Sequence, residues 1–250
     1  MSNVITFYDI PSKNPGQAWS PNTWKTRYSL NFKGLPYKTV WVEYPDIEAL
    51  CKKIGAPPTA TKADGTPFYT VPAIHDPSTN TVIADSILIA DYLDKTYPDT
   101  PKLLPPGTHA LQHAAINAYL PTGAPVFQFA IPLTHKLLGP GSQGYFRFHR
   151  EKLFGKTMED LTPTGPARDE EWAKVKAGFN VVDGWLQAGE GPYFLGKTPA
   201  FIDFVIGSRL YWLRQIFTED SPEYKDIMTW NEGRWATYVE GLKQYESVLI

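Results

Sequence analysis

The chain has 250 residues, of which 42% are hydrophobic and 14% aromatic, so it can build two modest domains or one large one with substantial cores. A formal net charge of −2 provides no basic field of the kind that holds nucleic acid or anionic lipid, so we expect neither nucleic acid nor a membrane as a partner. With Cys51 as its single cysteine, no N-x-S/T acceptor and no apolar run long enough for a membrane span, the chain is expected to be cytoplasmic.

Strand-like and helix-like segments alternate over the first part of the chain. The strand-like segments are rich in β-branched and aromatic residues and cover residues 4–10, 37–44, 68–76 and 80–84. After the first of them, Trp24, Tyr28, Phe32 and Leu35 recur with the period of one helix face, and Gly34 provides a stop. Two further helices are predicted over residues 46–55 and 85–98. The order β-α-β-α-β-β-α predicts a thioredoxin-like α/β domain over residues 1–100.

A proline-rich stretch, "PDTPKLLPPGT", then marks a domain boundary, and only helical periodicity follows it, so we expect an all-α domain over residues 109–250. The clearest helix covers residues 167–187, where Trp172, Val175, Phe179, Val182 and Leu186 form one apolar stripe. Further helices are predicted over residues 109–120, 126–138, 145–155, 201–217 and 233–246. We expect Pro121, Pro125 and Pro132 to break or kink the first long helical region.

Three short motifs in the first domain each allow two interpretations. Ser20 and Pro21 in "SPNTW" fit simple helix punctuation, or an anion site at a helix N-terminus. Pro72 in "YTVPAI" fits an edge strand, or a cis bond that turns the backbone of Val71 towards an extended, peptide-like ligand. Asp85 and Ser86 at the start of "DSILIADYL" fit capping, or a site for an ammonium and a carboxylate group.

Taken together, these motifs resemble the glutathione site of glutathione transferases. The tract "SPNTWKTRYSLNFKGLPY" is most similar to the fungal FuA class, which is related to bacterial aryl-ether-cleaving enzymes and to the omega-like branch; Ser20 stands where that branch carries cysteine. The resemblance implies that Val71, before a cis Pro72, pairs with the cysteinyl backbone of glutathione, and that Asp85 and Ser86 hold its γ-glutamyl end. It also implies a homodimer and the glutathione transferase fold, with a thioredoxin-like N-terminal domain and an all-helical C-terminal domain.

Two features depart from the family pattern. The insertion "PSKNPGQAW", residues 11–19, lengthens the connection before Ser20 and raises the question of whether it covers the site. In the second domain, the helix-capping signature of Ser or Thr followed by Asp reads "AFID", with Ala200 in place of the capping residue. Because alanine cannot cap, Thr198 and Pro199 are an alternative helix start.

The role expected for Ser20 follows from thiol chemistry. A free cysteine thiol is only about 3% ionised at pH 7, and the thiolate is the nucleophile. We expect the Ser20 hydroxyl to donate a hydrogen bond to the glutathione sulfur, aided by the N–H groups of Asn22 or Thr23. The Asn22 side chain and Tyr8, at the end of the first strand, are the alternative donors, although Tyr8 also fits a packed strand residue.

Other residues give weaker signals. Lys52 and Lys53 are candidates for the glycyl carboxylate of glutathione, but also fit a solvated helix face. Cys51 fits a small core residue, and His109 and His113 lack the further ligands that a metal site needs, so we expect no metal. The aromatic residues expected, as a group, to border the electrophile pocket are Tyr119, Phe127, Phe129, Tyr211 and Trp212.

The sequence therefore predicts a fungal, detoxifying glutathione transferase, with glutathione as co-substrate and apolar or aromatic small molecules as electrophiles. Peroxide reduction and aryl-ether cleavage are further activities that the resemblance allows. The alternative is a largely non-catalytic ligandin, which holds plant or wood phenolics in the same aromatic pocket.

Overall fold

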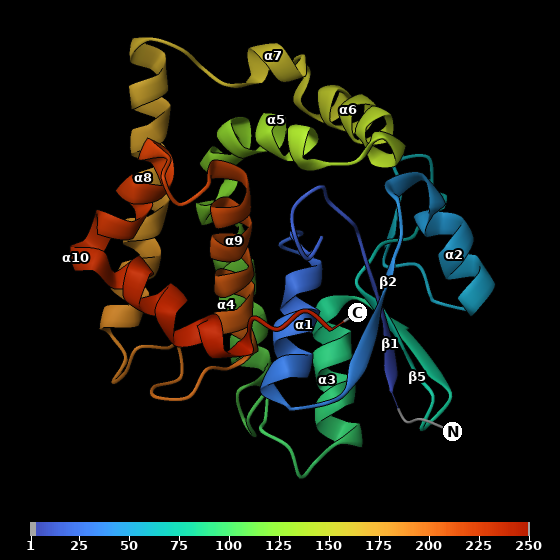
Figure 1. Ribbon diagram of the computed structural model, residues 1–250. Coiled ribbons are helices and arrows are strands. Elements are labelled where there is room, and N and C mark those ends of the chain that lie inside the picture. The colour runs from blue at the N-terminus through green and yellow to red at the C-terminus, as the bar shows by residue number, and fades with distance from the viewer. Residues whose placement is uncertain (1–3, 250) are drawn as a thin grey trace.

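The computed structural model describes residues 4–249. A four-stranded sheet with the order β2-β1-β5-β6 organises the first part of the chain (Figure 1). Its strands are β1 Ile5–Asp9, β2 Tyr37–Trp41, β5 Ala73–Asp76 and β6 Thr81–Ala84. β1 and β2 are parallel, and β5 runs antiparallel to both β1 and β6. The helices are α1 Thr23–Phe32, α2 Ile47–Ile54 and α3 Ser86–Thr96, so the expected thioredoxin-like arrangement is confirmed.

The loop between α2 and β5 contains a hairpin that the sequence did not predict. Its short strands are β3 Ala60–Thr61 and β4 Pro67–Phe68, paired antiparallel. Phe68, expected to open the third strand of the sheet, belongs to this hairpin instead. The strand of the main sheet begins only at Ala73, after the Val71–Pro72 bond, because proline has no N–H to donate to a ladder.

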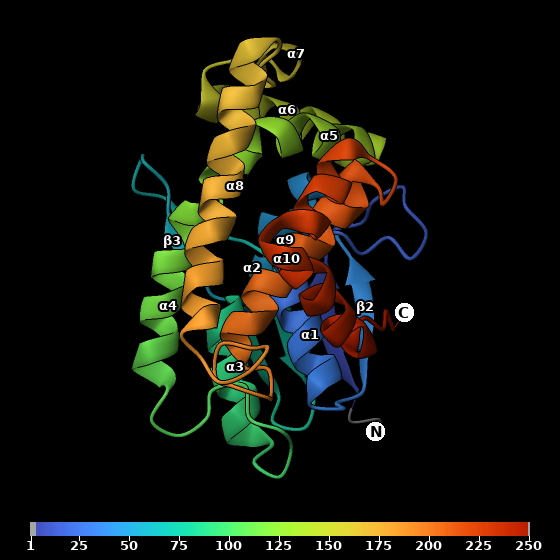
Figure 2. The ribbon, with the colours of Figure 1, turned by 90° about the vertical axis from the view of Figure 1, so that its left-hand side faces the viewer.

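The second part of the chain is helical throughout (Figures 1 and 2). Its helices are α4 His109–Thr122, α5 Phe127–Leu137, α6 Pro140–Phe154, α7 Met158–Leu161, α8 Pro166–Gln187, α9 Phe201–Phe217 and α10 Pro222–Leu242. Short 3₁₀ turns cover Tyr44–Asp46, Ala124–Val126 and Lys243–Tyr245. Within the described residues, none of these helices combines the length and apolar character that a bilayer span requires.

Two helical segments were missed by the sequence analysis. One is the single turn α7, and the other is the first part of α10. α10 is interrupted where Asn231, Glu232 and Gly233 adopt left-handed φ values of 53°, 58° and 78°. The helix predicted to start at Gly233 therefore corresponds to the part of α10 after this break.

Prolines divide the first long helical region, as expected. α4 ends just after Pro121, a 3₁₀ turn contains Pro125, and α5 follows. Pro132 lies inside α5, where its missing N–H leaves the carbonyl of Gln128 without a helical partner. The hydroxyl of Thr162 donates to that carbonyl at 2.8 Å, which compensates for the lost bond.

α9 begins at Phe201 although Ala200 cannot cap it, so the alternative start at Thr198 was wrong. The exposed N–H groups of this helix start have other acceptors. The N–H of Phe201 donates to the carbonyl of Leu103, and the N–H of Ile202 donates to Gln112 Oε1. Asp203 Oδ2 accepts the N–H of Ala200 at 2.8 Å. Neighbouring segments and a carboxylate thus replace the missing hydroxyl.

α1 packs between the sheet and α9, and so joins the two parts of the chain (Figure 1). Tyr28 stacks on Phe204 with ring centroids 5.6 Å apart, and its hydroxyl donates to Glu246. The C-terminal segment crosses back to β2, where Tyr37 and Thr39 donate to the carbonyls of Ser247 and Leu249. Contacts from both sides therefore fix α1, which begins three residues after Ser20.

Candidate functional site

The insertion before Ser20 packs along the ends of α5 and α9. The N–H of Lys13 donates to the carbonyl of Leu137 at 3.0 Å, and Asn14 Nδ2 donates to Gln215 Oε1 at 3.0 Å. At its end, Trp19 is only 2% exposed and lines the pocket beside Ser20. Its indole N–H has no hydrogen-bond partner among residues 4–249. The insertion thus contributes Trp19 to the wall of the site, and its hydrogen bonds to α5 and α9 tether Ser20 to the helical half.

Ser20 lies two residues before the N-cap position of α1, so its side chain is not the cap that the simplest interpretation predicted. Asn22 occupies the N-cap position and makes no side-chain cap. The Ser20 hydroxyl oxygen accepts the N–H of Asn22 at 3.3 Å, and its carbonyl accepts the N–H of Trp24 at 3.0 Å. The hydroxyl hydrogen has no acceptor among the described residues. Ser20 therefore keeps a free O–H donor, although it is only 2% exposed.

Ser20 opens on a pocket of about 260 Å³ between the first and second parts of the chain. The residues that line it besides Ser20 are Trp19, Pro21, Asn22, Tyr44, Phe127, Ile131, Thr134, Phe146, Arg150, Leu153, Phe154 and Trp212. Aromatic rings form much of the wall, and Asn22, Thr134 and Arg150 add polar groups to it. Such a mixture suits an aromatic molecule held next to a reacting group.

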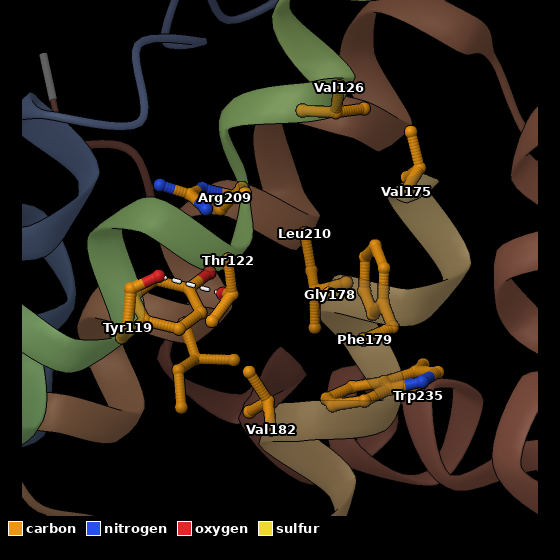
Figure 3. A pocket seen from close by; sticks show the side chains of 12 residues that line it. Tyr119, Thr122, Val126, Val175, Gly178, Phe179, Val182, Arg209, Leu210 and Trp235 are labelled. Carbon is orange, nitrogen blue, oxygen red and sulfur yellow. Dashed lines mark hydrogen bonds between the residues drawn. The ribbon is translucent and has the colours of Figure 1, made fainter. Parts of the chain in front are cut away.

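Of the five aromatic residues expected at this pocket, Phe127 and Trp212 line it and the other three do not. Tyr211 packs on Trp24 with ring centroids 3.8 Å apart, and Phe129 lines a different hollow beside Met158. Tyr119 lines a small cavity of about 20 Å³ between α4, α8 and α9 (Figure 3). Tyr119, Phe129 and Tyr211 therefore do not line the hollow beside Ser20, and their place in the electrophile site stays a prediction.

Figure 3 also shows Arg209 near Tyr119, with its guanidinium directed away from Val182 and Trp235. The guanidinium carbon lies 4.6 Å from the centroid of the Tyr119 ring. One of its nitrogens, Nη1, is buried without a partner among residues 4–249. None of the side chains that enclose this cavity lines the Ser20 pocket, so the two hollows are separate.

The remaining motif residues of the first domain meet at one end of the sheet. The Val71–Pro72 bond is cis, and the carbonyl of Pro72 accepts the N–H of Asp85 at 3.3 Å. Among residues 4–249, neither the N–H nor the carbonyl of Val71 forms a hydrogen bond with the backbone of a loop, turn or helix cap. Asp85 has φ 79° and caps α3 by accepting the N–H of Ile87 at 3.0 Å, and Ser86 is the first residue of that helix. The structure thus brings Val71, Asp85 and Ser86 together.

Lys25 is a charged residue of this region that the sequence analysis did not select. Its ammonium donates to Asn22 Oδ1 at 3.0 Å. Burial, and after it the charge of Arg209, lower the pKa of Lys25 to about 8, although Asp85 opposes both effects. No short motif marks such a residue, because only the packing of α1 against α3 and α9 places these charges near one another.

Other candidates lie elsewhere. Lys52 and Lys53 are exposed on α2 and do not line the Ser20 pocket, and Lys52 Nζ bonds Glu48 at 2.8 Å. Tyr8 is 7% exposed, and burial raises the pKa of its hydroxyl, as does Cys51. Cys51 is fully buried, which agrees with a core residue. His109 faces Asp91 at 3.6 Å, and residues 4–249 contain no group of three or more metal-ligating side chains.

Family models decide the identity of the chain. The N-terminal domain model of glutathione S-transferases matches residues 19–96, and the C-terminal domain model of glutathione S-transferases matches residues 110–245. The chain belongs to the glutathione S-transferase family. It is therefore an enzyme of the transferase class, with glutathione as co-substrate.

Solved structures and a curated relative agree with this assignment. The transferase is 47% identical to a glutathione S-transferase of Ceriporiopsis subvermispora crystallised with glutathione; the match covers 98% of this chain and 99% of that one, with a TM-score of 0.93. GSTFuA3 from Phanerochaete chrysosporium is 44% identical, with 99% of each chain covered and a TM-score of 0.93. The glutathione S-transferase-like protein ustS of Aspergillus flavus is 32% identical over 92% of this chain and 87% of its own length. The resemblance to the fungal FuA class is thus confirmed.

Proposed function

We propose that this transferase holds the thiol of glutathione as a thiolate against the Ser20 hydroxyl and delivers it to aromatic electrophiles in the adjoining pocket. The observation that carries the proposal is the free O–H of Ser20 at the edge of an aromatic pocket. The N–H of Asn22 bonds the Ser20 oxygen, so it fixes the hydroxyl and favours donation of its hydrogen.

Glutathione would lie along the end of the sheet, with its cysteinyl backbone paired to Val71, next to Pro72. Its γ-glutamyl end would reach Asp85 and Ser86, while Asn22 would flank the sulfur. The contact of Asp85 with Pro72, and that of Asn22 with Ser20, support this placement. Lys52 and Lys53 stay candidates for the glycyl carboxylate of glutathione; both are exposed on α2, and Lys52 Nζ bonds Glu48 at 2.8 Å.

Ser20→Ala tests the catalytic role. A hydrogen bond to a charged group contributes roughly 1.5–3 kcal/mol, and about 1.4 kcal/mol corresponds to a tenfold change in rate. We therefore expect turnover of an aryl chloride at pH 7 to fall about tenfold, with the pKa of the bound thiol raised by about one unit. The pKa is read from the ultraviolet absorbance of the thiolate in the binary complex.

Ser29→Ala is the matched control, because Ser29 is a buried serine of α1 that donates to the carbonyl of Lys25 and lies outside the pocket. It should leave the thiol pKa in place. A thiol pKa that is the same in Ser20→Ala and in the unaltered protein would refute the role of Ser20.

The aromatic wall of the pocket favours a second candidate, a ligandin that binds phenolics with little turnover. A glutathione-affinity column, followed by conjugation, peroxide-reduction and aryl-ether-cleavage assays, separates the two functions. Retention on the column together with phenolic binding but without turnover would favour the ligandin. Turnover in one of the three assays would favour the transferase and would identify its reaction.

We also propose that the transferase is a homodimer. Leu88 on α3 and Leu111 on α4 are both 56% exposed, and the contact between Asp91 and His109 joins the same two helices. We expect light scattering to give about twice the monomer mass of 28.1 kDa. Leu111→Glu should shift the protein towards monomer, whereas Val181→Glu, at a 47% exposed position on α8, should not. A monomeric unaltered protein would contradict this proposal.

A further inference from the structure

Arg150, on α6, is the only charged side chain among residues 4–249 that lines the pocket beside Ser20. Its guanidinium carbon lies 5.1 Å from the centroid of the Phe146 ring, which also lines the pocket. Two further apolar side chains of the same helix, Leu153 and Phe154, line the pocket as well. A cation against such a wall is poorly screened and attracts negative charge more strongly than it would in water.

No carboxylate forms an ion pair with Arg150 among residues 4–249, and carboxylates of the neighbouring segments have partners of their own. Asp9 pairs with Arg27, Glu151 pairs with Arg147, and Glu43 accepts a hydrogen bond from Ser142. The positive charge of Arg150 is therefore left for a ligand.

Tyr44 contributes a second donor next to this charge. Tyr44 lines the same pocket as Arg150, and burial raises the pKa of Tyr44 to about 12 against the opposing effect of Arg150. At neutral pH the hydroxyl is consequently uncharged and does not neutralise the guanidinium. It keeps an O–H that can bond the same anion.

We propose that Arg150 makes the pocket selective for aromatic electrophiles that carry a carboxylate, with Tyr44 as a second donor to that group. The proposal rests on the proposed transferase function. A planar guanidinium matches the two oxygens of a carboxylate, and the apolar wall accepts the ring. With an aryl chloride, the glutathione sulfur forms a bond to the ring carbon, the carbon–chlorine bond breaks, chloride leaves and the thiol proton passes to solvent. The carboxylate takes no part in the bond changes.

The test compares 4-chloro-3-nitrobenzoate with its methyl ester, which has the same reacting carbon but no charge. In Arg150→Gln, we expect the ratio of kcat/KM for the acid to kcat/KM for the ester to fall about tenfold, which corresponds to about 1.4 kcal/mol, mainly through KM for the acid. Arg150→Lys keeps the charge and should regain part of the ratio. Lys152→Gln, which removes an exposed cation from the same helix outside the pocket, should keep the ratio within about twofold.

An unchanged ratio in Arg150→Gln, or equal loss for both compounds, would overturn the inference and leave the proposed function intact. A second measurement needs no variant and no turnover. The affinities of the acid and of the ester for the unaltered protein are measured in the presence of S-methylglutathione, with quenching of tryptophan fluorescence as the signal. The acid should bind about tenfold more tightly than the ester. Equal affinities would overturn the inference, whereas loss of glutathione binding itself would overturn the proposed function.

Discussion

Replacing Arg27 by methionine is expected to destabilise the transferase by about 3–5 kcal/mol. Arg27 and Asp9 form an ion pair of 2.7 Å in which both side chains are fully buried. Methionine fills much of the arginine volume but leaves the Asp9 carboxylate with a single remaining donor, the N–H of Ile10. The decrease in the free energy of unfolding is measured by urea unfolding at pH 7, with tryptophan fluorescence as the signal.

The surroundings of Arg27 explain why the effect should be large. Its guanidinium carbon lies 4.9–5.7 Å from the ring centroids of four aromatic residues, which are Phe7, Trp24, Tyr37 and Trp41. Water therefore cannot reach the carboxylate that the substitution leaves behind. Because Arg27 joins α1 to β1 and β2, its loss should also loosen the segment that presents Ser20.

A double variant separates the charge effect from the loss of packing. Asp9→Asn combined with Arg27→Met removes both charges and keeps an acceptor for the Ile10 N–H, so it should be less destabilised than Arg27→Met alone. Lys38→Met is the control, because Lys38 is an exposed cation on the same sheet. This substitution should change the free energy of unfolding by no more than about 0.5 kcal/mol. If Arg27→Met were as stable as the unaltered protein, the prediction would be contradicted.

The parts of the fold that follow local patterns could be read from the sequence. α9 occupies the predicted residues 201–217, because its apolar residues continue through the whole helix and all but a few of its side chains are buried. The start of α6 was missed, since "PGSQG" has no apolar period, although Pro140 after Gly139 is a recognisable helix start. The glutathione motifs could be placed because they lie close together in the sequence and depend on the resemblance.

The wall of the pocket could not be predicted, because it depends on how each helix is rotated. Phe127 and Phe129 are two positions apart on α5, so they point in different directions, and only Phe127 reaches the pocket. The neighbours Tyr211 and Trp212 likewise point in different directions: Tyr211 packs on Trp24, and Trp212 lines the pocket. Tyr44 and Arg150 come from segments far apart in the sequence and carry no motif. Their meeting is a result of tertiary packing alone.

The second large effect is expected at Asp203, where replacement by alanine should cost about 3 kcal/mol or more. The carboxylate accepts the N–H of Ala200 and of Phe194 and the hydroxyl of Tyr238, all within 2.6–2.9 Å. Each buried donor left without a partner costs about 1–3 kcal/mol. Asp226→Ala, which removes an exposed carboxylate bonded to Trp172, is the control and should lose less than about 1 kcal/mol.

Asp203 should also make the stability of α9 depend on pH. Burial raises the pKa of its carboxyl group from 3.8 to about 6, against the opposing hydrogen bonds from Ala200, Tyr238 and Phe194. Between pH 3.8 and about pH 6 the folded protein keeps a proton on Asp203 that the unfolded chain has released. The stabilisation linked to this proton is therefore fully present below about pH 4, and it is lost as the pH rises through about 6. Asp203→Asn cannot titrate. The free energy of unfolding of the unaltered protein, minus that of Asp203→Asn, should therefore fall by about 2.5 kcal/mol from pH 4 to pH 7. A difference that stays constant across this range would show that the carboxylate is already charged at the low end.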